Sequence, residues 1–256
     1  MAACQSLPRY AMHQNKPSIL STRPLTAEQQ TAVIAAGISM DELQFIDTIP
    51  ENGNTIREGV ENIIKQNTTV VFTSMNAVEA VAGFIKPKIP QWRIYTVGTA
   101  TSSLVKQYFG DASLKATASS AAALAEMILQ DGDTDEVTFF CSNMRRNELP
   151  VILKNHGVTV NEWVVYQTIA LPHKLSKKYD GILFFSPSAV DSFFNSNQVA
   201  AETVLFAIGH TTAAAVKKYC SNTIITSHLP GKDNLLKKVL LYFSEGTNKH
   251  GETAHS

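Results

Sequence analysis

The chain has 256 residues, of which 44% are hydrophobic and 17% charged, and its 22 basic residues balance 22 acidic ones. This length allows one large domain or two smaller ones, and the composition is typical of a soluble globular protein. A net charge of zero argues against bulk nucleic-acid binding, and no apolar run approaches the roughly 18 residues that span a bilayer, so neither nucleic acid nor membrane is an expected partner.

Apolar, β-rich runs alternate with helical patterns along the chain. Several runs are continuously apolar, which is typical of strands covered on both faces. The expected strands are 18–22, 43–49, 68–74, 93–98, 136–142, 161–170, 181–187, 204–209 and 222–227. The expected helices are 27–37, 76–85, 101–109, 120–132, 147–157, 189–194, 211–219 and 234–243. Strands alternating with helices predict an α/β fold with parallel sheets.

Two stretches of the chain recur at a nearly constant offset. The stretch FTSMNAVEAV (72–81) matches FFSPSAVDSF (184–193), and YTVGTATSSLVKQYFG (95–110) matches FAIGHTTAAAVKKYC (206–220). Ser186 follows Ser74 by 112 positions, and Gly209 follows Gly98 by 111. Two matches at nearly one offset indicate an internal duplication.

A third echo links ILSTRPLTAEQ near the start with FFCSNMRRNEL (139–149), each a strand, a polar step and a helix. A step is the short polar stretch between a strand and the helix that follows it. The step in ILSTRPLTAEQ and FFCSNMRRNEL is called first-type, and the steps at Ser74 and Ser186 and at Gly98 and Gly209 are called Ser-type and Gly-type. The three types occur twice along the chain in that order. Sequential sets of three are the simpler arrangement. Interleaving requires the chain to cross between domains near 47–50 and return near 170–173, where Pro50 and Pro172 follow extended stretches.

Polar residues follow these strands at the points where helices begin. In an open parallel sheet ligands bind outside the carboxyl ends of the strands, and helix N-termini favour anions. Each Ser or Thr could equally be a helix cap with no further role. Six such steps in two matching domains predict a cleft for a ligand with several negative charges. Gly98 and Gly209 predict a close backbone approach or an unusual turn.

The sequence contains no sign of metal or nucleotide chemistry. It has no GxGxxG motif, P-loop or G-x-S-x-G elbow, and its seven histidines have no metal-ligand spacing. An enzyme with this sequence would need little general acid–base machinery and would act mainly by holding a reactive substrate in one shape. Three singly placed cysteines and the lack of an apolar signal segment suggest the cytoplasm. Flexible tails are expected at 1–17 and 246–256.

Six motifs in order, ILSTRP, VVFTSMNAVEAV, TVGTATSSLV, VVYQT, FFSPSAVDSFF and AIGHTTAAAVK, resemble the uroporphyrinogen-III synthase family from Ile19 to Leu240. The resemblance implies two similar flavodoxin-like α/β domains, each a parallel sheet with helices on both faces. A two-stranded connector joins them, and the chain crosses over and returns. The implied domains are 18–46 plus 172–245, and 48–170.

The resemblance also implies an activity. The family converts hydroxymethylbilane, a linear tetrapyrrole octacarboxylate, into uroporphyrinogen III, with loss of water and inversion of ring D through a spiro intermediate. No metal or organic cofactor is implied. Because the bilane closes without enzyme to the wrong isomer, the enzyme must impose conformation more than supply acid or base. The upstream bilane-forming enzyme is a candidate partner, and a monomer is expected.

Site residues are carried over from the resemblance motif by motif. Tyr166 in VVYQT is the expected catalytic residue, since a phenol with a pKa near about 10 can donate to a departing hydroxyl. A strand-end tyrosine that only packs at the domain junction is the alternative. The expected substrate-binding residues are Arg23, Thr73, Ser74, Thr99, Thr101, Asn143, Ser186, Ser188, His210 and Thr212. Arg23 and His210 could instead face solvent.

Two other functions remain open at this point. The first is a non-catalytic relative that uses the same two-lobed fold to bind a polycarboxylate. The second is a two-lobed α/β enzyme that acts on a phosphorylated metabolite, with phosphates bound at the helix N-termini. The presence of Tyr166 and all the threonines weighs against a decayed site.

Overall fold

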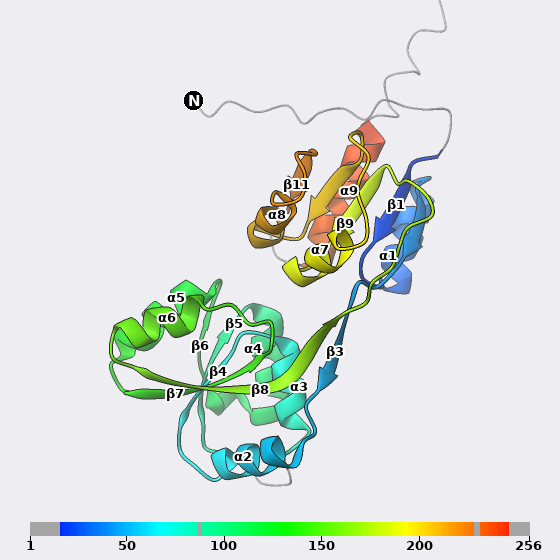
Figure 1. The fold of residues 1–256 in the computed structure, drawn as a ribbon. Coiled ribbons are helices and arrows are strands. Elements are labelled where there is room, and N and C mark those ends of the chain that lie inside the picture. Colours follow the sequence, from blue (N-terminus) through cyan, green and yellow to red (C-terminus); the bar gives the residue numbers. More distant parts are fainter. Residues whose placement is uncertain (1–15, 86–88, 228–230, 246–256) are drawn as a thin grey trace, which may run out of the picture. The chain divides into compact units, whose positions relative to one another are not determined.

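The computed structural model of the chain describes residues 16–85, 89–227 and 231–245. The tails expected at 1–17 and 246–256 lie outside these residues, apart from 16 and 17. The chain divides into two compact units (Figure 1). The first unit takes the chain up to Asp47 and from Ala170 onward, and the second is Thr48–Ile169.

The first unit is a parallel sheet with helices on both faces. Its strand order is β11-β10-β9-β1-β2, and every pair is parallel. The strands are β1 (Ser18–Ser21), β2 (Ser39–Glu42), β9 (Gly181–Phe184), β10 (Val204–Ala207) and β11 (Ile224–Thr226), and the helices are α1 (Ala27–Ala35), α7 (Pro187–Phe194), α8 (His210–Val216) and α9 (Lys232–Glu245). In chain order this is 2-1-3-4-5, the flavodoxin arrangement.

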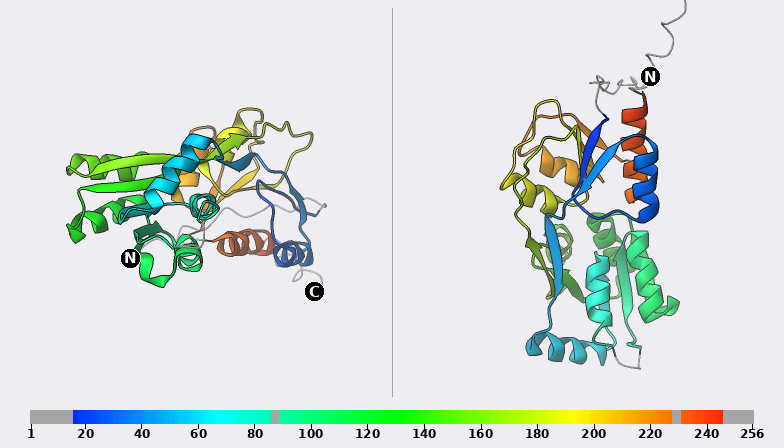
Figure 2. Two further views of the ribbon diagram at one scale, coloured as in Figure 1. Left: turned by 90° about the horizontal axis from the view of Figure 1, so that it is seen from below. Right: turned by 90° about the vertical axis from the view of Figure 1, so that its right-hand side faces the viewer.

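Alternation along each strand of the first unit explains the two helical layers. Ile19, Leu183 and Phe206 belong to the hydrophobic cluster under α1 and α9. Their neighbours Leu20 and Phe184 belong to the cluster with α7 and α8. Helices α1 and α9 contact each other and run side by side (Figure 2, right). Both faces are therefore covered, as the continuously apolar strands predicted.

The second unit has a sheet in the order β3-β8-β7-β4-β5-β6. Its strands are β3 (Ile46–Pro50), β4 (Thr69–Phe72), β5 (Arg93–Val97), β6 (Leu114–Ala118), β7 (Glu136–Ser142) and β8 (Thr159–Ala170). Its helices are α2 (Asn54–Ile64), α3 (Met75–Ala82), α4 (Thr99–Phe109), α5 (Ala121–Asp131) and α6 (Glu148–Asn155), with a 3-10 turn η1 (Asp111–Ser113). From β8 to β6 all pairs are parallel.

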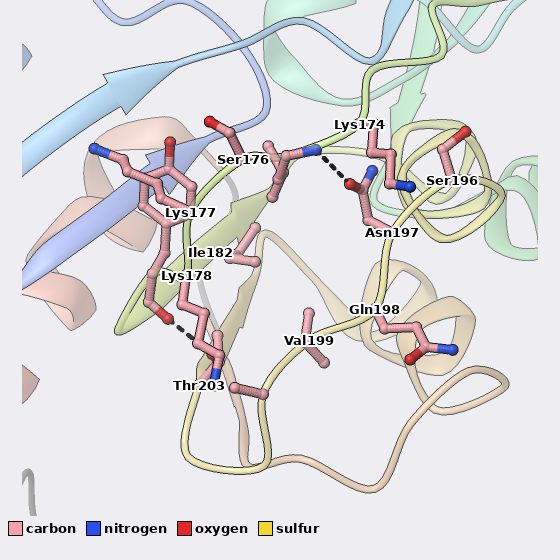
Figure 3. A pocket seen from close by; sticks show the side chains of 13 residues that line it. Lys174, Ser176, Lys177, Lys178, Ile182, Ser196, Asn197, Gln198, Val199 and Thr203 are labelled. Carbon is pink, nitrogen blue, oxygen red and sulfur yellow. Dashed lines mark hydrogen bonds between the residues drawn. The ribbon is translucent and has the colours of Figure 1, made fainter.

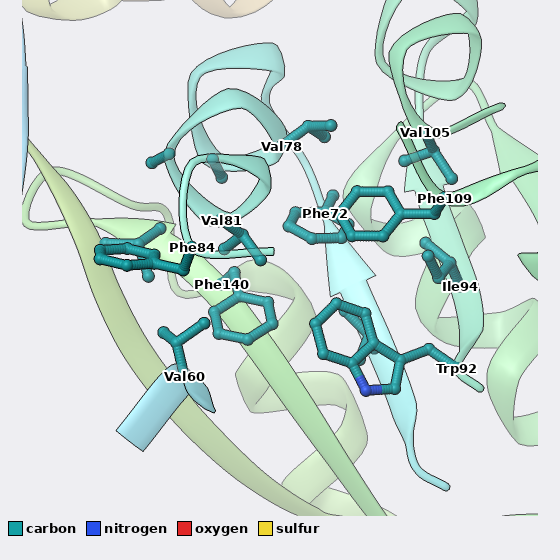
Figure 4. Packing of buried hydrophobic residues seen from close by; sticks show 14 of the residues in the cluster. Val60, Phe72, Val78, Val81, Phe84, Trp92, Ile94, Val105, Phe109 and Phe140 are labelled. Atoms are coloured by element: carbon teal, nitrogen blue, oxygen red, sulfur yellow. The ribbon is translucent and has the colours of Figure 1, made fainter. Parts of the chain in front are cut away.

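Aromatic side chains fill the face of this sheet that packs under α2, α3 and α4 (Figure 4). The ring centroids of Phe72 and Phe140 lie 5.4 Å apart, and those of Trp92 and Phe109 lie 5.5 Å apart. The opposite face, with Val71 among its residues, packs under α5 and α6. Such aromatic packing fixes β4 and β7 side by side, which positions the residues that follow them.

The two chain segments that connect the units, β3 and β8, are neighbours in the sheet. The N–H of Leu171 donates to the carbonyl of Phe45 at 2.9 Å, and the N–H of Glu51 donates to the carbonyl of Val165 at 2.9 Å. Because one residue number rises as the other falls, the two segments run antiparallel. The expected two-stranded connector, with the chain crossing over and returning, is confirmed.

The strand order also decides between the two arrangements of the duplicated sets. In the first unit β1, β9 and β10 are the first-type, Ser-type and Gly-type strands in spatial order, and in the second unit β7, β4 and β5 are. The sets are therefore interleaved, and the sequential arrangement is wrong. Strands β8-β7-β4-β5-β6 of the second unit thus have the same spatial order of types as β2-β1-β9-β10-β11 of the first. In the second unit the chain forms the Ser-type strand β4 before the first-type strand β7.

Two strands, one α-helix and the short 3-10 turn η1 were not predicted. Strands β2 (SMDE) and β6 (LKATA) lie at sheet edges and contain no buried apolar run. Helix α2 does carry a helical pattern, with Ile56, Val60 and Ile63 on one face packing into the sheet. The spacing of these residues in the sequence is that of an amphipathic helix. No helix among the described residues combines the length and apolar character needed to cross a membrane.

Gly59 on α2 packs directly against the indole of Trp163 on β8. A Cβ added at Gly59 would overlap Cζ3 and Cη2 of that ring. Gly59→Ala should gain about 1 kcal/mol of helix propensity but lose about 1–3 kcal/mol through overpacking, so we expect a net decrease in the free energy of unfolding. Urea denaturation measures this change.

Gly83→Ala is the matched control for this substitution. The added Cβ would lie 3.4 Å from the nearest atom, the carbonyl oxygen of Ala80, which is an ordinary distance. The backbone φ at Gly83 is −61°, which alanine adopts freely. We expect Gly83→Ala to be neutral or stabilising, and a Gly59→Ala variant as stable as the parent would contradict the tight contact.

Candidate active site

Tyr166 lies beside Ser142, the last residue of β7, and a β-bulge sets the face toward which it points. Register along β7 and β8 pairs Cys141 with Val164 and then Ser142 with Tyr166, skipping Val165. Val165 and Tyr166, although consecutive, therefore both join the cluster on the α2–α4 face. Bulges commonly re-aim side chains next to functional sites. The Tyr166 side chain is mostly buried, with the residue 8% exposed.

The phenol of Tyr166 meets the Ser-type step of the same unit. Its oxygen lies 2.9 Å from Oγ of Ser74, and either hydroxyl can be the donor. Ser74 is the N-cap of α3 and accepts a hydrogen bond from the N–H of Ala77 at 3.4 Å. When Ser74 donates to Tyr166, the phenolic proton is free for a ligand. The pair can therefore hold or release one proton at the phenol.

A cavity of about 340 Å³ opens beside Tyr166. Its polar lining includes Arg57, Asn76 and Glu79, and Phe84 contributes an apolar wall. The Arg57 guanidinium lies 5.5 Å from the Phe84 ring centroid and forms no ion pair within the described chain. This cation and the phenol line the same cavity, where they could meet a carboxylate and a leaving hydroxyl of one ligand.

The other expected residues of the second unit have different environments. Thr73 is half-buried and Thr101 is buried at 5% exposure, and neither hydroxyl has a hydrogen-bond partner in the described protein. Thr99 is exposed at the start of α4. Asn143 binds the backbone of Thr168, accepting from its N–H at 2.8 Å and donating to its carbonyl at 3.3 Å. Asn143 therefore holds β8 in place, two residues beyond Tyr166.

The first unit presents the same steps at equivalent positions. Ser186 is the N-cap of α7 and accepts from the N–H of Ala189 at 3.2 Å, as Ser74 accepts from Ala77. Ser188 is half-buried, and His210 is exposed at the start of α8. Thr212 is the third residue of α8, as Thr101 is of α4, and it is 2% exposed. The duplication seen in the sequence is thus a duplication of helix caps.

The two glycines differ. Gly98 has φ of 83°, a left-handed conformation that favours glycine, so the expected unusual turn is present. Gly209 has φ of −171°, which is extended backbone, and a Cβ there would meet nothing within 4 Å. The expectation of an unusual turn at Gly209 is wrong.

Two cations lie together at the carboxyl edge of the first unit's sheet. Arg23 follows β1 and is exposed. Lys232, the first residue of α9, donates from Nζ to the carbonyl of Pro24 at 3.1 Å and lies 6.0 Å from the ring centroid of Phe185, which precedes Ser186. Burial and the positive charge of Arg23 lower the pKa of Lys232.

Nearby carboxylates bind other donors. Oε1 of Glu42 accepts from the N–H of Leu25 at 2.9 Å, and Oδ1 of Asp233 accepts from the amide of Gln29 at 2.7 Å. Neither Arg23 nor Lys232 forms an ion pair within the described residues. The charges of Glu42 and Asp233 still act on Lys232 and partly offset the effect of Arg23. Two cations held together with no carboxylate bound directly to either can bind an anion.

A family model described as "Uroporphyrinogen-III synthase HemD" matches residues 27–237 of the chain. The chain belongs to the uroporphyrinogen-III synthase family. Members of this family are cyclising lyases of tetrapyrrole biosynthesis, and the match supports a catalytic member and not the non-catalytic relative considered above.

One relative and two solved structures are similar to the chain. The chain is 25% identical over 244 residues to the uroporphyrinogen-III synthase of Saccharomyces cerevisiae, covering 80% of this chain and 83% of that protein. A mutant uroporphyrinogen III synthase from Thermus thermophilus shares the fold with a TM-score of 0.66 and 12% identity, covering 91% and 99% of the two chains. The Helicobacter pylori uroporphyrinogen-III synthetase has a TM-score of 0.63 at 16% identity, covering 88% and 99%.

Three residues were not predicted from the sequence, two in the cavity of the second unit and one beside Arg23 in the first unit. Asn76 lies inside the repeated stretch FTSMNAVEAV, but Asn is not a hydroxyl step. Arg57 lies on α2, which is not among the helices expected from the sequence. Lys232 reaches Arg23 only because α9 packs against α1 and the sheet, a contact for which the sequence carries no signal.

Proposed function

We propose that the chain catalyses closure of hydroxymethylbilane to uroporphyrinogen III, with inversion of ring D and loss of water. The observation that carries this proposal is the Tyr166–Ser74 hydroxyl pair, whose phenol lines a cavity together with an unpaired Arg57, in a member of this family. The cavity offers a proton and a positive charge, and the substrate has a leaving hydroxyl and carboxylates to receive them.

In the proposed reaction Tyr166 gives its phenolic proton to the hydroxyl of the hydroxymethyl group. The carbon–oxygen bond breaks, water leaves and an azafulvene cation forms. Ser74 then donates its O–H to the phenolate oxygen, at the 2.9 Å separation already present, while its own oxygen still accepts from Ala77. A hydrogen bond to the charged form stabilises it.

The later steps restore the proton. The substituted carbon of ring D attacks the cation to give the spiro intermediate, which fragments and recloses at the free position. The carbon at the free position loses its proton when the ring recloses there, and this proton returns to the Tyr166 phenolate, so that one water is the net product. Because the carbon–carbon steps need no further acid or base, the remaining task of the protein is to hold ring D in the inverted orientation.

Both units are proposed to supply donors for the substrate carboxylates. In the second unit these are Arg57, Asn76 and the unpartnered hydroxyls of Thr73 and Thr101, with Thr99 at the rim. In the first unit they are Arg23, Lys232, Ser186, Ser188, His210 and Thr212. Asn143 is proposed to act on β8 and not on the substrate, since both ends of its amide bind Thr168.

The direct test is to supply hydroxymethylbilane to the protein and separate the isomers of the oxidised product by chromatography. We expect isomer III to predominate and to form faster than the spontaneous reaction. Heat-denatured protein provides the background rate of isomer I. A product that is only isomer I, formed at the background rate, would refute the proposed function.

The cytoplasmic location, the monomeric state and the upstream bilane-forming enzyme as partner belong to the same proposal. Light scattering during size-exclusion chromatography tests the monomer. A coupled assay tests the transfer of bilane from the upstream enzyme. The lag before uroporphyrinogen III forms should be shorter when the two enzymes are mixed than when a dialysis membrane separates them.

A further inference from the structure

A second cavity lies in the first unit at the edge of the sheet opposite to the candidate site. It has a volume of about 360 Å³ and is lined by residues that precede β9 and β10, together with Ile182 in β9 (Figure 3). Because these strands begin at Gly181 and Val204, the lining lies at their amino ends. Ser186 and His210 follow the carboxyl ends of the same strands, so the two sites are separate.

The charge of this cavity is positive. Lys174, Lys177 and Lys178 line it, and no acidic residue does. Lys177 is neutralised by Asp41, with Nζ and Oδ2 2.6 Å apart, and this contact helps to lower the pKa of Asp41. Lys174 and Lys178 have neither an ion pair nor a hydrogen bond within the described residues. Two ammonium groups are therefore available to a ligand.

The shape of the cavity is fixed by buried side chains that bind backbone atoms. Asn197 accepts from the N–H of Leu175 at 2.8 Å and donates to the carbonyls of His173 and Phe193 at 2.7 and 2.9 Å. Thr203 donates to the carbonyl of Tyr179 at 2.7 Å. These bonds join the loop before β9 to the loop before β10. A cavity held in this way needs little reorganisation to bind a ligand.

We propose that this cavity binds a small organic dicarboxylate. In Figure 3 Lys174 lies beside Ser196 and Asn197, whereas Lys178 lies on the side of Thr203, so the two free ammonium groups are at separate places on the rim. Ile182 and Val199 lie between these two sides and form an apolar floor. The arrangement fits a flat or short apolar body with an acidic group at each end, and cavities of about 300 Å³ or more hold such molecules.

The probe is isophthalate, a benzene ring with two carboxylates, and benzoate is its matched control with one. Backbone amide shifts in two-dimensional NMR report both the affinity and the site. We expect isophthalate to shift amides of 174–179 and 196–203 and not those of 186–188 or 210–212. We expect it to bind about tenfold more tightly than benzoate, because the second carboxylate adds one charge-assisted contact.

Lys174→Met and Lys178→Met remove one charge each and keep the aliphatic stem. Each variant should weaken isophthalate about tenfold and bring it to the affinity of benzoate. Lys218→Met, an exposed lysine outside this cavity, should change nothing. Turnover of hydroxymethylbilane should be unaffected in all three, so the result is independent of the proposed function.

Several results would overturn the inference. Benzoate or inorganic phosphate that binds as tightly as isophthalate would show that two separated acidic groups are not recognised. Shifts confined to other residues would place the ligand elsewhere. Full isophthalate affinity in both lysine variants, with amide spectra that show them folded, would exclude the assigned cations.

Discussion

Tyr166→Phe is expected to lower the rate of enzymatic ring closure about a hundredfold, which is the lower range for loss of a positioned general acid. The ring of phenylalanine fills the same buried space, so the effect isolates one hydroxyl. Its loss removes the proton that leaves with the bilane hydroxyl and also removes the partner of Ser74. Single-turnover measurement of isomer III formation checks the expected rate.

Stability should change little in this variant, because a single hydrogen bond contributes only about 1 kcal/mol. Tyr108→Phe, an exposed tyrosine on α4, is the matched control and should leave the rate unchanged. Unaltered turnover in Tyr166→Phe would remove this residue from the mechanism and leave family membership standing.

Ser74→Ala provides a further check on the same pair. If Ser74 acts through the phenol, the double variant Ser74→Ala with Tyr166→Phe should be no slower than Tyr166→Phe alone. Independent roles would instead make the two losses multiply.

The double variant Arg23→Gln with Lys232→Gln is expected to raise KM about a hundredfold, on the basis of roughly tenfold for each charge-assisted hydrogen bond that is removed. The value of kcat should fall less, because these groups bind carboxylates and do not touch the reacting carbon. Each single variant should raise KM by less than about tenfold. Removal of one cation relieves the repulsion on the other, so the remaining cation holds its charge and binds the carboxylate more strongly. Steady-state kinetics of the three proteins checks the pattern.

The pH dependence of the single variants provides a second readout. Burial and Arg23 lower the pKa of Lys232, so this lysine loses its charge at a lower pH than an ordinary lysine. Substrate binding should therefore weaken as the pH rises through that lowered pKa. In Arg23→Gln the pKa of Lys232 rises, and the weakening should move to higher pH.

Lys217→Gln is the control. This exposed lysine follows the C-terminal end of α8, which packs against β10 and β11, and its substitution should leave both KM and its pH profile unchanged. A profile that is identical in the parent and in Arg23→Gln would show that the two cations are not coupled.

Burial on both faces explains why most of the fold could be predicted from the sequence. The runs VVF, FFC and ILFF contain nothing but apolar residues, which only a strand with helices on both faces requires. The edge strand β6 (LKATA) has one neighbour and a half-exposed surface, so it carries no such run. The spatial order of the duplicated strands depends on pairing between strands far apart in the sequence, which local sequence patterns do not reveal.

Within the candidate site, only interactions between residues close together in the sequence could be predicted. The caps Ser74 and Ser186 each bind a backbone N–H three residues later, so their sequence context predicts them. The approach of Tyr166 to Ser74 depends on β7 lying between their strands and on one bulge, neither of which the sequence specifies locally. The same holds for Lys232 and Arg23, which come together only after α9 packs.

The interleaved topology has a consequence for the order in which the chain acquires structure during synthesis. Strands β1 and β2 leave the ribosome first, but the partner of β1 on its other side, β9, begins only at Gly181. All strands from β3 to β8 are complete by Ala170, so the inserted unit has its full sheet available earlier. The amino-terminal segment therefore waits unpaired on one side while the later-encoded unit folds, and translation of β9 to β11 closes the first sheet.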